Sequence, residues 1–250
     1  MAPRTEPRTV DLSVERGLRR SVSLAQAFRV EQTRPEVFYG ALAADSVAVV
    51  QEFGALDGRL VLDVGAGPPE FATAFAAGGA DYVALDQDRV ALEADRAGSC
   101  VVARAERLPF RDGSVDVAFS SNVIEHVRQP GRLADELVRV TRPGGLVVVS
   151  YTNWLSPWGG HETSPFHYLG GDWAVRRYTR HYGRRPKNRV GENLFRVSVG
   201  WGLGWARSQP DAELLAARPR YYPNWASGLV RVPGLREVLT WNLLLVLRRR

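Results

Sequence analysis

Cysteine and lysine are almost missing from this chain, because Cys100 is its only cysteine and Lys187 its only lysine. A lone cysteine excludes a disulfide framework and a cysteine-based metal site within one chain. All basic residues other than Lys187 are arginine, and this skew reduces the weight of the net charge of +6 as a sign of nucleic-acid binding. We therefore expect a cytoplasmic protein whose partner is not a nucleic acid.

Long apolar runs are also missing. The N-terminal stretch "MAPRTEPRTVDLSVERGLRR" lacks the apolar segment of a secretory signal. No run approaches the roughly 18 apolar residues that a transmembrane helix needs. The chain is nevertheless 45% hydrophobic over 250 residues, which is enough for one sizeable core. We expect a single domain over residues 1–250.

Short β-branched runs alternate with helical segments in the middle of the chain. The runs "RLVLDV", "DYVALD", "CVVA", "VDVAFS" and "GLVVVSY" are apolar on both faces. This is typical of a parallel sheet covered by helices on each side. Helices are expected at 11–30, from Pro35 onward, and at 69–78, 88–96 and 131–141. The pattern predicts an α/β, Rossmann-like fold.

The regular alternation ends after Tyr151. Residues 152–192 are rich in Gly, Trp, His and Arg without a clear period, which suggests a functional insertion or lid. A helix at 198–208 with Ser198 as its N-cap, a strand at 212–219 and a last strand in "TWNLLLVLRRR" complete a seven-stranded, mostly parallel sheet. The expected parts are an N-terminal tail and helical cap (1–57), a cofactor-binding core (58–151), a substrate or lid insertion (152–192) and a C-terminal completion of the sheet (193–250).

The stretch "VLDVGAGPPEFATAF" combines an apolar strand with a glycine loop and a helix. Gly65 and Gly67 permit a tight turn and close approach of the backbone to a ligand. Asp86, at the tip of the next strand, can accept both hydroxyls of a ribose. Glu70 stands where a dinucleotide fingerprint needs glycine, which weakens a nicotinamide or flavin interpretation.

Four blocks resemble the class I S-adenosylmethionine-dependent methyltransferases: "VLDVGAG", "YVALDQD", "AERLPFRDGSVDVAFSSNVIEHV" and "LVRVTRPGGLVVVSY". The flanks "FRVEQTRPEVFYGALAAD", "GGHETSPFHYLGG" and "PKNRVGENLF" resemble an uncharacterised mycobacterial and actinobacterial branch of that family. The resemblance implies S-adenosylmethionine as cofactor and S-adenosylhomocysteine as product. It also implies the following cofactor-binding residues: Asp63, Gly65, Ala66, Gly67, Asp86, Gln87, Ala105, Glu106, Ser120, Ser121 and Asn122.

Two positions depart from the family pattern. Pro69 replaces a usual glycine, although Pro68-Pro69 fits the start of a helix and removes only one donor from the loop. Arg104 replaces an aspartate that accepts from the adenine amino group, and arginine has no acceptor. Arg104 would instead stack on the adenine or point to solvent, leaving adenine recognition to the backbone near Ala105.

The segment "WGGHETSPFHY" holds the densest set of reactive side chains. His161, Glu162 and His167 are the candidate catalytic residues, because a hydroxyl acceptor benefits from a nearby base. His161 and Glu162 could be a base and its orienter or two ligands of a divalent cation; alternatively, the histidines simply bond backbone. No residue is assigned to a metal, and the need for one stays open. We expect O-methylation of a small-molecule or glycan-like acceptor.

Residues 171–189 carry six arginines and one lysine interleaved with aromatics. They could form a solvated helix, a clamp for an anionic acceptor, or an RNA-binding surface. Arg29, Gln32 and Tyr39 are candidate residues of a cap over the cofactor, by analogy with the family. The rival functions are a non-catalytic cofactor-binding protein and an RNA methyltransferase, and the oligomeric state stays open.

Overall fold

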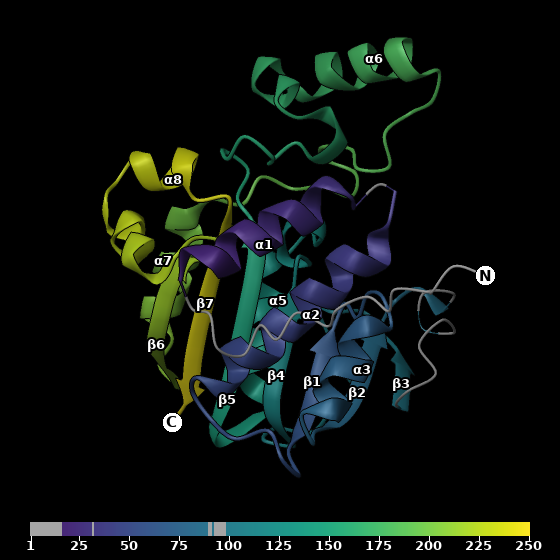
Figure 1. The fold of residues 1–250 in the computed structure, drawn as a ribbon. Helices are drawn as coiled ribbons and strands as arrows, with labels where there is room; N and C mark the ends of the chain where they lie inside the picture. The colour runs from purple at the N-terminus through teal and green to yellow at the C-terminus, as the bar shows by residue number, and fades with distance from the viewer. Residues whose placement is uncertain (1–16, 32, 90–91, 93–98) are drawn as a thin grey trace, which may run out of the picture.

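The computed structural model describes residues 17–31, 33–89, 92 and 99–250. Its centre is a seven-stranded sheet in the order β3-β2-β1-β4-β5-β7-β6 (Figure 1). Only β7 runs antiparallel to its neighbours β5 and β6. The predicted class, an α/β fold with a mostly parallel sheet, is confirmed. The strands are β1 (Leu60–Val64), β2 (Asp81–Asp86), β3 (Ser99–Val102), β4 (Val115–Ser121), β5 (Thr141–Thr152), β6 (Ala212–Pro219) and β7 (Asn242–Arg249).

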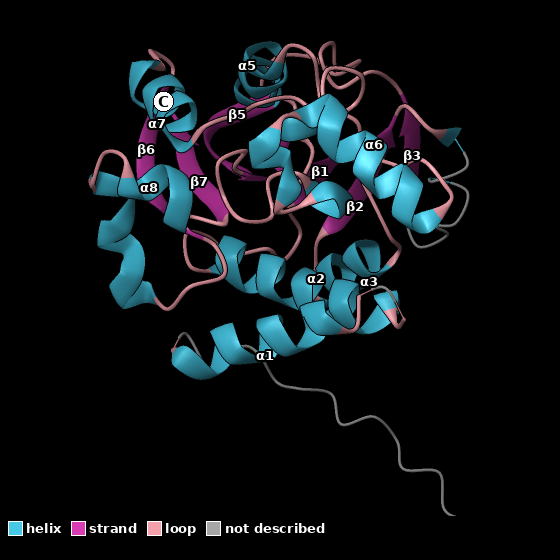
Figure 2. Ribbon diagram, turned by 90° about the horizontal axis from the view of Figure 1, so that it is seen from above, coloured by secondary structure: helices cyan, strands magenta, loops and turns pink. Residues whose placement is uncertain are grey.

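Helices cover both faces of the sheet (Figure 2). On one face lie α1 (Leu18–Arg29), α2 (Pro35–Gln51) and α3 (Glu70–Ala77), and on the other lie α5 (Pro130–Val140) and α7 (Val199–Ser208). The remaining helical segments are α6 (Gly171–Tyr182), α8 (Leu235–Leu239) and the 3₁₀ turns η1 (Ile124–His126), η2 (His161–Thr163), η3 (Phe166–Leu169) and η4 (Asn224–Arg231). None of the helices in the described residues is long and apolar enough to cross a membrane.

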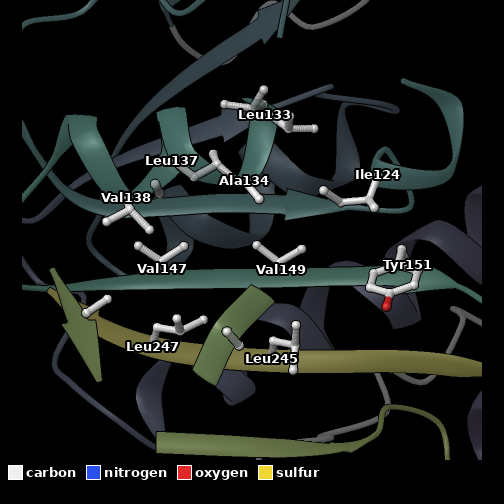
Figure 3. Packing of buried hydrophobic residues seen from close by; sticks show 14 of the residues in the cluster. Ile124, Leu133, Ala134, Leu137, Val138, Val147, Val149, Tyr151, Leu245 and Leu247 are labelled. Carbon is white, nitrogen blue, oxygen red and sulfur yellow. The ribbon is translucent and has the colours of Figure 1, made fainter. Parts of the chain in front are cut away.

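The core is formed where the apolar stripe of α5 packs on β5 and β7 (Figure 3). Leu133 and Leu137 of α5 and Val147 of β5 are fully buried. Burial of one such leucine contributes about 1.5–3 kcal/mol. A second cluster beneath α2 and α3 includes Phe75 and Phe119, whose ring centroids are 5.3 Å apart. Because both sheet faces are buried, the strand ends are held rigidly and can position a site.

The sheet changes direction between β1 and β4. The chain proceeds from β1 outward through β2 to β3, and then returns to place β4 on the other side of β1. In open α/β sheets, ligands bind at the carboxyl ends of the strands beside such a switch point. The fold therefore indicates a binding site where β1 and β4 end.

The insertion at residues 152–192 contains a regular helix that its sequence pattern did not reveal. Residues 152–192 were expected to have no clear period, yet they contain α6, which ends at Gly183 with φ 69°. Ala174 and Tyr178 form its buried face, while its arginines 176, 177 and 180 are exposed. A solvated basic helix was among the expected alternatives. The sequence shows no clear period here because aromatic and arginine side chains hide the short apolar stripe.

Other local predictions can be compared directly. Ser198 caps α7 as expected, because its hydroxyl accepts from the backbone N–H of Trp201 at 3.0 Å. The first helix spans Leu18–Arg29, and residues 11–16 of the helix expected at 11–30 lie outside the described residues. The expected tail at 1–11 and most of the helix expected at 88–96 lie outside the described residues.

Candidate active site

A cleft of about 390 Å³ opens at the carboxyl ends of the central strands. Gly65 follows β1, Asp86 ends β2 and Asn122 follows β4, and all three line the cleft. Parallel strands bring these ends to one edge of the sheet, so residues far apart in sequence share one wall.

Gly65 is the tightest point of the glycine loop. Its φ of +77° lies in the left-handed region, and a Cβ there would be 2.3 Å from Cγ2 of Val123. Its N–H donates to the carbonyl of Leu85 at 2.7 Å, which ties the loop to β2. Only glycine satisfies both demands without strain. The helix α3 begins directly after Pro69, whose φ is −63°, so the expected proline start of this helix is confirmed.

Asp86 and Gln87 form the wall at the end of β2. The carboxylate of Asp86 accepts from the N–H of Asp88 at 2.8 Å through Oδ1. Partial burial raises its pKa. A half-buried carboxylate with remaining acceptor capacity fits a pair of ribose hydroxyls. The acceptor carboxylate of Asp86 and the close-approach glycine Gly65 therefore fit the adenosyl group that the sequence implies.

Ala105 and Glu106 also line the cleft, on the side expected for the adenine. Arg104 has a side chain that is 78% exposed, with Nε 3.6 Å from the Glu106 carboxylate. Arg104 also lines the cleft, so its exposed side chain is compatible with both expected alternatives, stacking on an adenine or pointing to solvent.

A clamp formed by Glu136 and Arg139 of α5 holds the loop that follows Glu106. Glu136 accepts from the N–H of Leu108 at 2.7 Å, while Arg139 donates to the carbonyls of Leu108 and Phe110 at 3.1 and 2.9 Å. Hydrogen bonding to Arg139 lowers the pKa of Glu136. The clamp fixes this wall of the cleft through backbone groups, and sequence reasoning did not find it.

Five of the expected cofactor residues do not line the cleft: Asp63, Ala66, Gly67, Ser120 and Ser121. Asp63 is buried and accepts from the Tyr82 hydroxyl at 2.7 Å. Ser120 is buried and donates to the carbonyl of Val64 at 2.9 Å, which fastens β4 to β1. Ala66 is buried, whereas Gly67 is exposed with open space around it among the described residues.

Ser121 belongs to a buried network below the cleft. Its hydroxyl accepts from the guanidinium of Arg220 at 2.7 Å, and Arg220 also donates to Ser150 at 2.6 Å. Arg220 is 1% exposed and forms a 3.5 Å ion pair with Asp45 of α2. The network joins the helical cap to the ends of β4 and β5. Asn122, directly after Ser121, has φ 58° and faces the cleft.

His161 approaches two residues of η1 that sequence reasoning did not select. Its ring centroid is 5.0 Å from that of His126, which itself lines the cleft. Potential ligand atoms of Glu125, His126 and His161 all lie within 4.8 Å of one another. Burial lowers the pKa of His161. We call these three residues the histidine cluster; it places imidazole groups at the Asn122 end of the cleft.

Glu162 and His167 point to other partners. Glu162 accepts from the side-chain amide of Asn188 at 3.0 Å through Oε2. His167 is 2% exposed, and its Nε2 lies 3.1 Å from the carbonyl of Trp154. A Cβ on Gly160 would be 2.5 Å from the Cβ of His167, so this histidine fills space inside the insertion. The structure joins His161 to Glu125 and His126 and leaves His167 among backbone partners.

The three residues expected to cap the cofactor, Arg29, Gln32 and Tyr39, differ in their surroundings. The Tyr39 hydroxyl donates to Glu31 at 3.4 Å, and burial together with the Glu31 charge raises the pKa of Tyr39 to about 12. Burial also raises the pKa of Glu31, and the charge of Glu162 adds to this shift. Arg29 is exposed, and Gln32 lies outside the described residues.

Comparisons with known proteins agree with this geometry. Residues 62–149 match a family model described as a methyltransferase domain. A protein from Mycolicibacterium gilvum, named an uncharacterized methyltransferase, is 55% identical over 92% of this chain and 94% of its own length. A protein of the same name from Mycobacteroides abscessus is 50% identical over 98% of this chain and 100% of its own.

Among solved structures, an S-adenosylmethionine-dependent methyltransferase from Mesorhizobium loti has a TM-score of 0.58. It is 20% identical and covers 82% of this chain and 98% of its own, so it shows a shared fold. The position of the cleft at the switch point, the glycine loop and the relatives with 50% and 55% sequence identity all indicate the same protein family. The chain belongs to the S-adenosylmethionine-dependent methyltransferase family, and S-adenosylmethionine is its cofactor.

Proposed function

We propose that the protein methylates a hydroxyl oxygen of a small-molecule or glycan-like acceptor. The observation that carries this proposal is the position of His126. It lines the same cleft as Gly65 and Asp86 and contacts His161 of the insertion. A group that promotes loss of a hydroxyl proton therefore adjoins the Asn122 end of the cleft, where the resemblance expects the reactive methyl group.

When bound, the cofactor would supply a methyl group on a positively charged sulfur; the O–C bond would form as the C–S bond breaks, and the sulfur would keep the electron pair. The protein must align the acceptor oxygen and exclude water. The hydroxyl proton leaves through the histidine cluster to solvent. Glu125 thereby takes the place beside His161 that the sequence had given to Glu162.

The predicted cofactor residues divide into two roles in this proposal. Contact is assigned to those that line the cleft: Gly65, Asp86, Gln87, Ala105, Glu106 and Asn122. The buried ones position these contacts: Asp63 through Tyr82, Ser120 through Val64 and Ser121 through Arg220. Gly67 and Ala66 shape the loop between them.

The insertion and the N-terminal helices form the acceptor side in this proposal. The arginines of α6 are exposed and do not line the cleft. The charges of Glu31 and Glu162 act on one another near Tyr39. This arrangement favours a neutral polyol, phenol or glycan over an anionic acceptor. We place the reaction in the cytoplasm, because a chain with one cysteine has no internal disulfide that would call for an oxidising compartment.

The test is a methyl-transfer screen over polyols, phenols and glycans, with S-adenosylhomocysteine release as the readout. Each acceptor is assayed with and without added divalent metal. Calorimetric titration with S-adenosylhomocysteine runs in parallel. Product with a hydroxyl compound is expected. Tight binding of S-adenosylhomocysteine without turnover on any acceptor would favour a non-catalytic binding protein instead.

A further inference from the structure

The histidine cluster has the composition of a catalytic zinc site. One carboxylate and two imidazoles, from Glu125, His126 and His161, offer ligand atoms within 4.8 Å of one another. Two histidines and one glutamate form a common three-ligand set for catalytic zinc, which leaves a fourth position for water or substrate. The short turn η1 supplies two of these residues and η2 supplies the third.

Backbone carbonyls orient both imidazoles for ligation. Nδ1 of His126 lies 2.8 Å from the carbonyl of Asn193, and Nδ1 of His161 lies 3.4 Å from that of Gly159. A carbonyl only accepts, so in each contact the proton sits on Nδ1 and the lone pair on Nε2 is free. Metal-bound histidines are held in this way by the N–H opposite the metal.

Glu125 provides an independent observation. Its side chain is 0% exposed, and Oε1 accepts from the N–H of Thr152 at 2.8 Å. Oε2 is enclosed and has no hydrogen-bond partner among the described residues. A buried carboxylate oxygen without a partner is costly unless an ion or a donor occupies the adjacent space. The free lone pairs of His126 and His161 cannot fill this need, because they also accept.

The backbone of His161 is fixed in an unusual conformation. Its φ of 51° is in the left-handed region, which costs a non-glycine residue about 1–3 kcal/mol. The preceding residue, Gly160, is also constrained, because His167 occupies the space that a Cβ at this position would need. The side chain of His161 is therefore directed by surrounding structure instead of by local preference.

We propose that Glu125, His126 and His161 bind one divalent cation of the zinc type, open toward the cleft. The inference rests on the proposed function for the acceptor's location and specifies how the cluster acts on it. A hydroxyl in the fourth position would lose its proton more readily, because a bound cation acts as a Lewis acid. With the cation bound, the Nε2 lone pairs of His126 and His161 would be occupied, so the proton would pass directly to water in the cleft instead of to an imidazole.

The test uses untagged protein treated with a chelator and then titrated with Zn²⁺ by calorimetry and with Co²⁺ by visible absorption. We expect one ion per chain and the absorption bands of four-coordinate Co²⁺. His161→Asn keeps a residue that tolerates positive φ, and Glu125→Gln keeps an acceptor for Thr152. Each variant should weaken Zn²⁺ binding on the order of 100-fold. His181→Asn, on the exposed face of α6, is the matched control and should bind as the wild type does.

Absence of Zn²⁺ binding in the wild type, or equal affinity in all variants, would overturn the inference. Titration with S-adenosylhomocysteine shows that each variant is folded, independently of the metal. Different results would refute the cation site and the proposed methylation of a hydroxyl. Full methyl transfer by chelated protein would refute the cation and leave the methylation intact. Cluster-dependent Zn²⁺ binding without methylation of any hydroxyl would support the cation and refute the acceptor class.

Discussion

The cofactor side and the acceptor side of the cleft are built in different ways. The cofactor side comes from consecutive strand ends, with Gly65, Asp86 and Asn122 each following a strand of the central sheet. The acceptor side joins η1, η2 and the segment around Asn193, which are distant in sequence. The first is held by strand ladders, and the second by single contacts between side chains and backbone.

This difference has a physical consequence. A change on the cofactor side should alter affinity for the cofactor, because we propose that the strand ends bind it directly. A change in the histidine cluster should alter turnover and leave that affinity intact. The two sides can therefore be separated experimentally by measuring binding of S-adenosylhomocysteine and methyl transfer on the same variants.

The largest expected effect is that of His161→Asn on turnover. Loss of the imidazole should lower kcat by about 10²–10⁴-fold, the usual contribution of proton-transfer assistance, whether His161 takes the proton itself or holds the proposed cation. The dissociation constant of S-adenosylhomocysteine should stay at the wild-type value. His181→Asn should change neither quantity. A parallel loss of cofactor affinity in His161→Asn would erase the distinction between the two sides.

Gly65→Ala should disrupt the glycine loop on the cofactor side of the cleft. A Cβ would lie 2.3 Å from Val123 at a φ of +77°. The strain and overpacking should weaken S-adenosylhomocysteine binding on the order of 100-fold. Gly58→Ala is the control, since its φ is +62° with no atom of the described residues within 4 Å. It should cost stability but leave affinity unchanged; an equal loss in both would point to general destabilisation.

Asp86→Asn should weaken S-adenosylhomocysteine binding less than Gly65→Ala does. The amide keeps the acceptor for the Asp88 N–H but removes the charge from the ribose contact. Affinity for S-adenosylhomocysteine should fall about tenfold by calorimetry, in keeping with the strength of charge-assisted hydrogen bonds. Asp81→Asn, at the opposite end of β2, should bind normally. Unaltered binding by Asp86→Asn would remove this residue from the cofactor site.

Glu136→Gln should have the smallest effect of the four substitutions, and it should act on the stability of the fold. It weakens the clamp on the adenine-side loop and should lower the free energy of unfolding by about 1 kcal/mol near neutral pH. The pKa of Glu136 is lowered from 4.5 in the folded state. Its contribution is therefore complete above about pH 4.5 and disappears as the pH falls through the lower folded pKa.

Thermal unfolding at several pH values measures this dependence. The difference in Tm between wild type and Glu136→Gln should shrink in acid. Asp112→Asn is the control, because Asp112 binds the same Arg139 but is 73% exposed. A Tm difference that grows as the pH falls would contradict the assignment.

The sequence predicted the cofactor side better than the acceptor side. Alternation of apolar strands and helices predicted the sheet, and the glycine loop after β1 predicted the edge of the sheet at which the cleft opens. The partners of His161 could not be read from spacing, since Glu125 is placed beside it only by the packing of η1 against the insertion. Adjacent Glu162 was the natural choice in sequence, yet its Oε2 accepts from Asn188.

Some predicted cofactor residues have hydrogen-bond partners inside the protein that the sequence did not reveal. Ser120 and Asp63 occupy family positions beside a cofactor, but in this chain both are buried and bonded within the protein. Burial depends on what packs above a strand end, which one sequence does not reveal. The clamp of Glu136 and Arg139 was missed for a similar reason, because most charged residues on a helix are solvated.

A crystal structure with bound S-adenosylhomocysteine tests the central claim most directly. The account predicts the ribose hydroxyls on Asp86, the adenine beside Ala105 and the sulfur at Asn122, facing His126 and His161. A ligand with its sulfur at the Arg104 end, or bound outside this cleft, would contradict it.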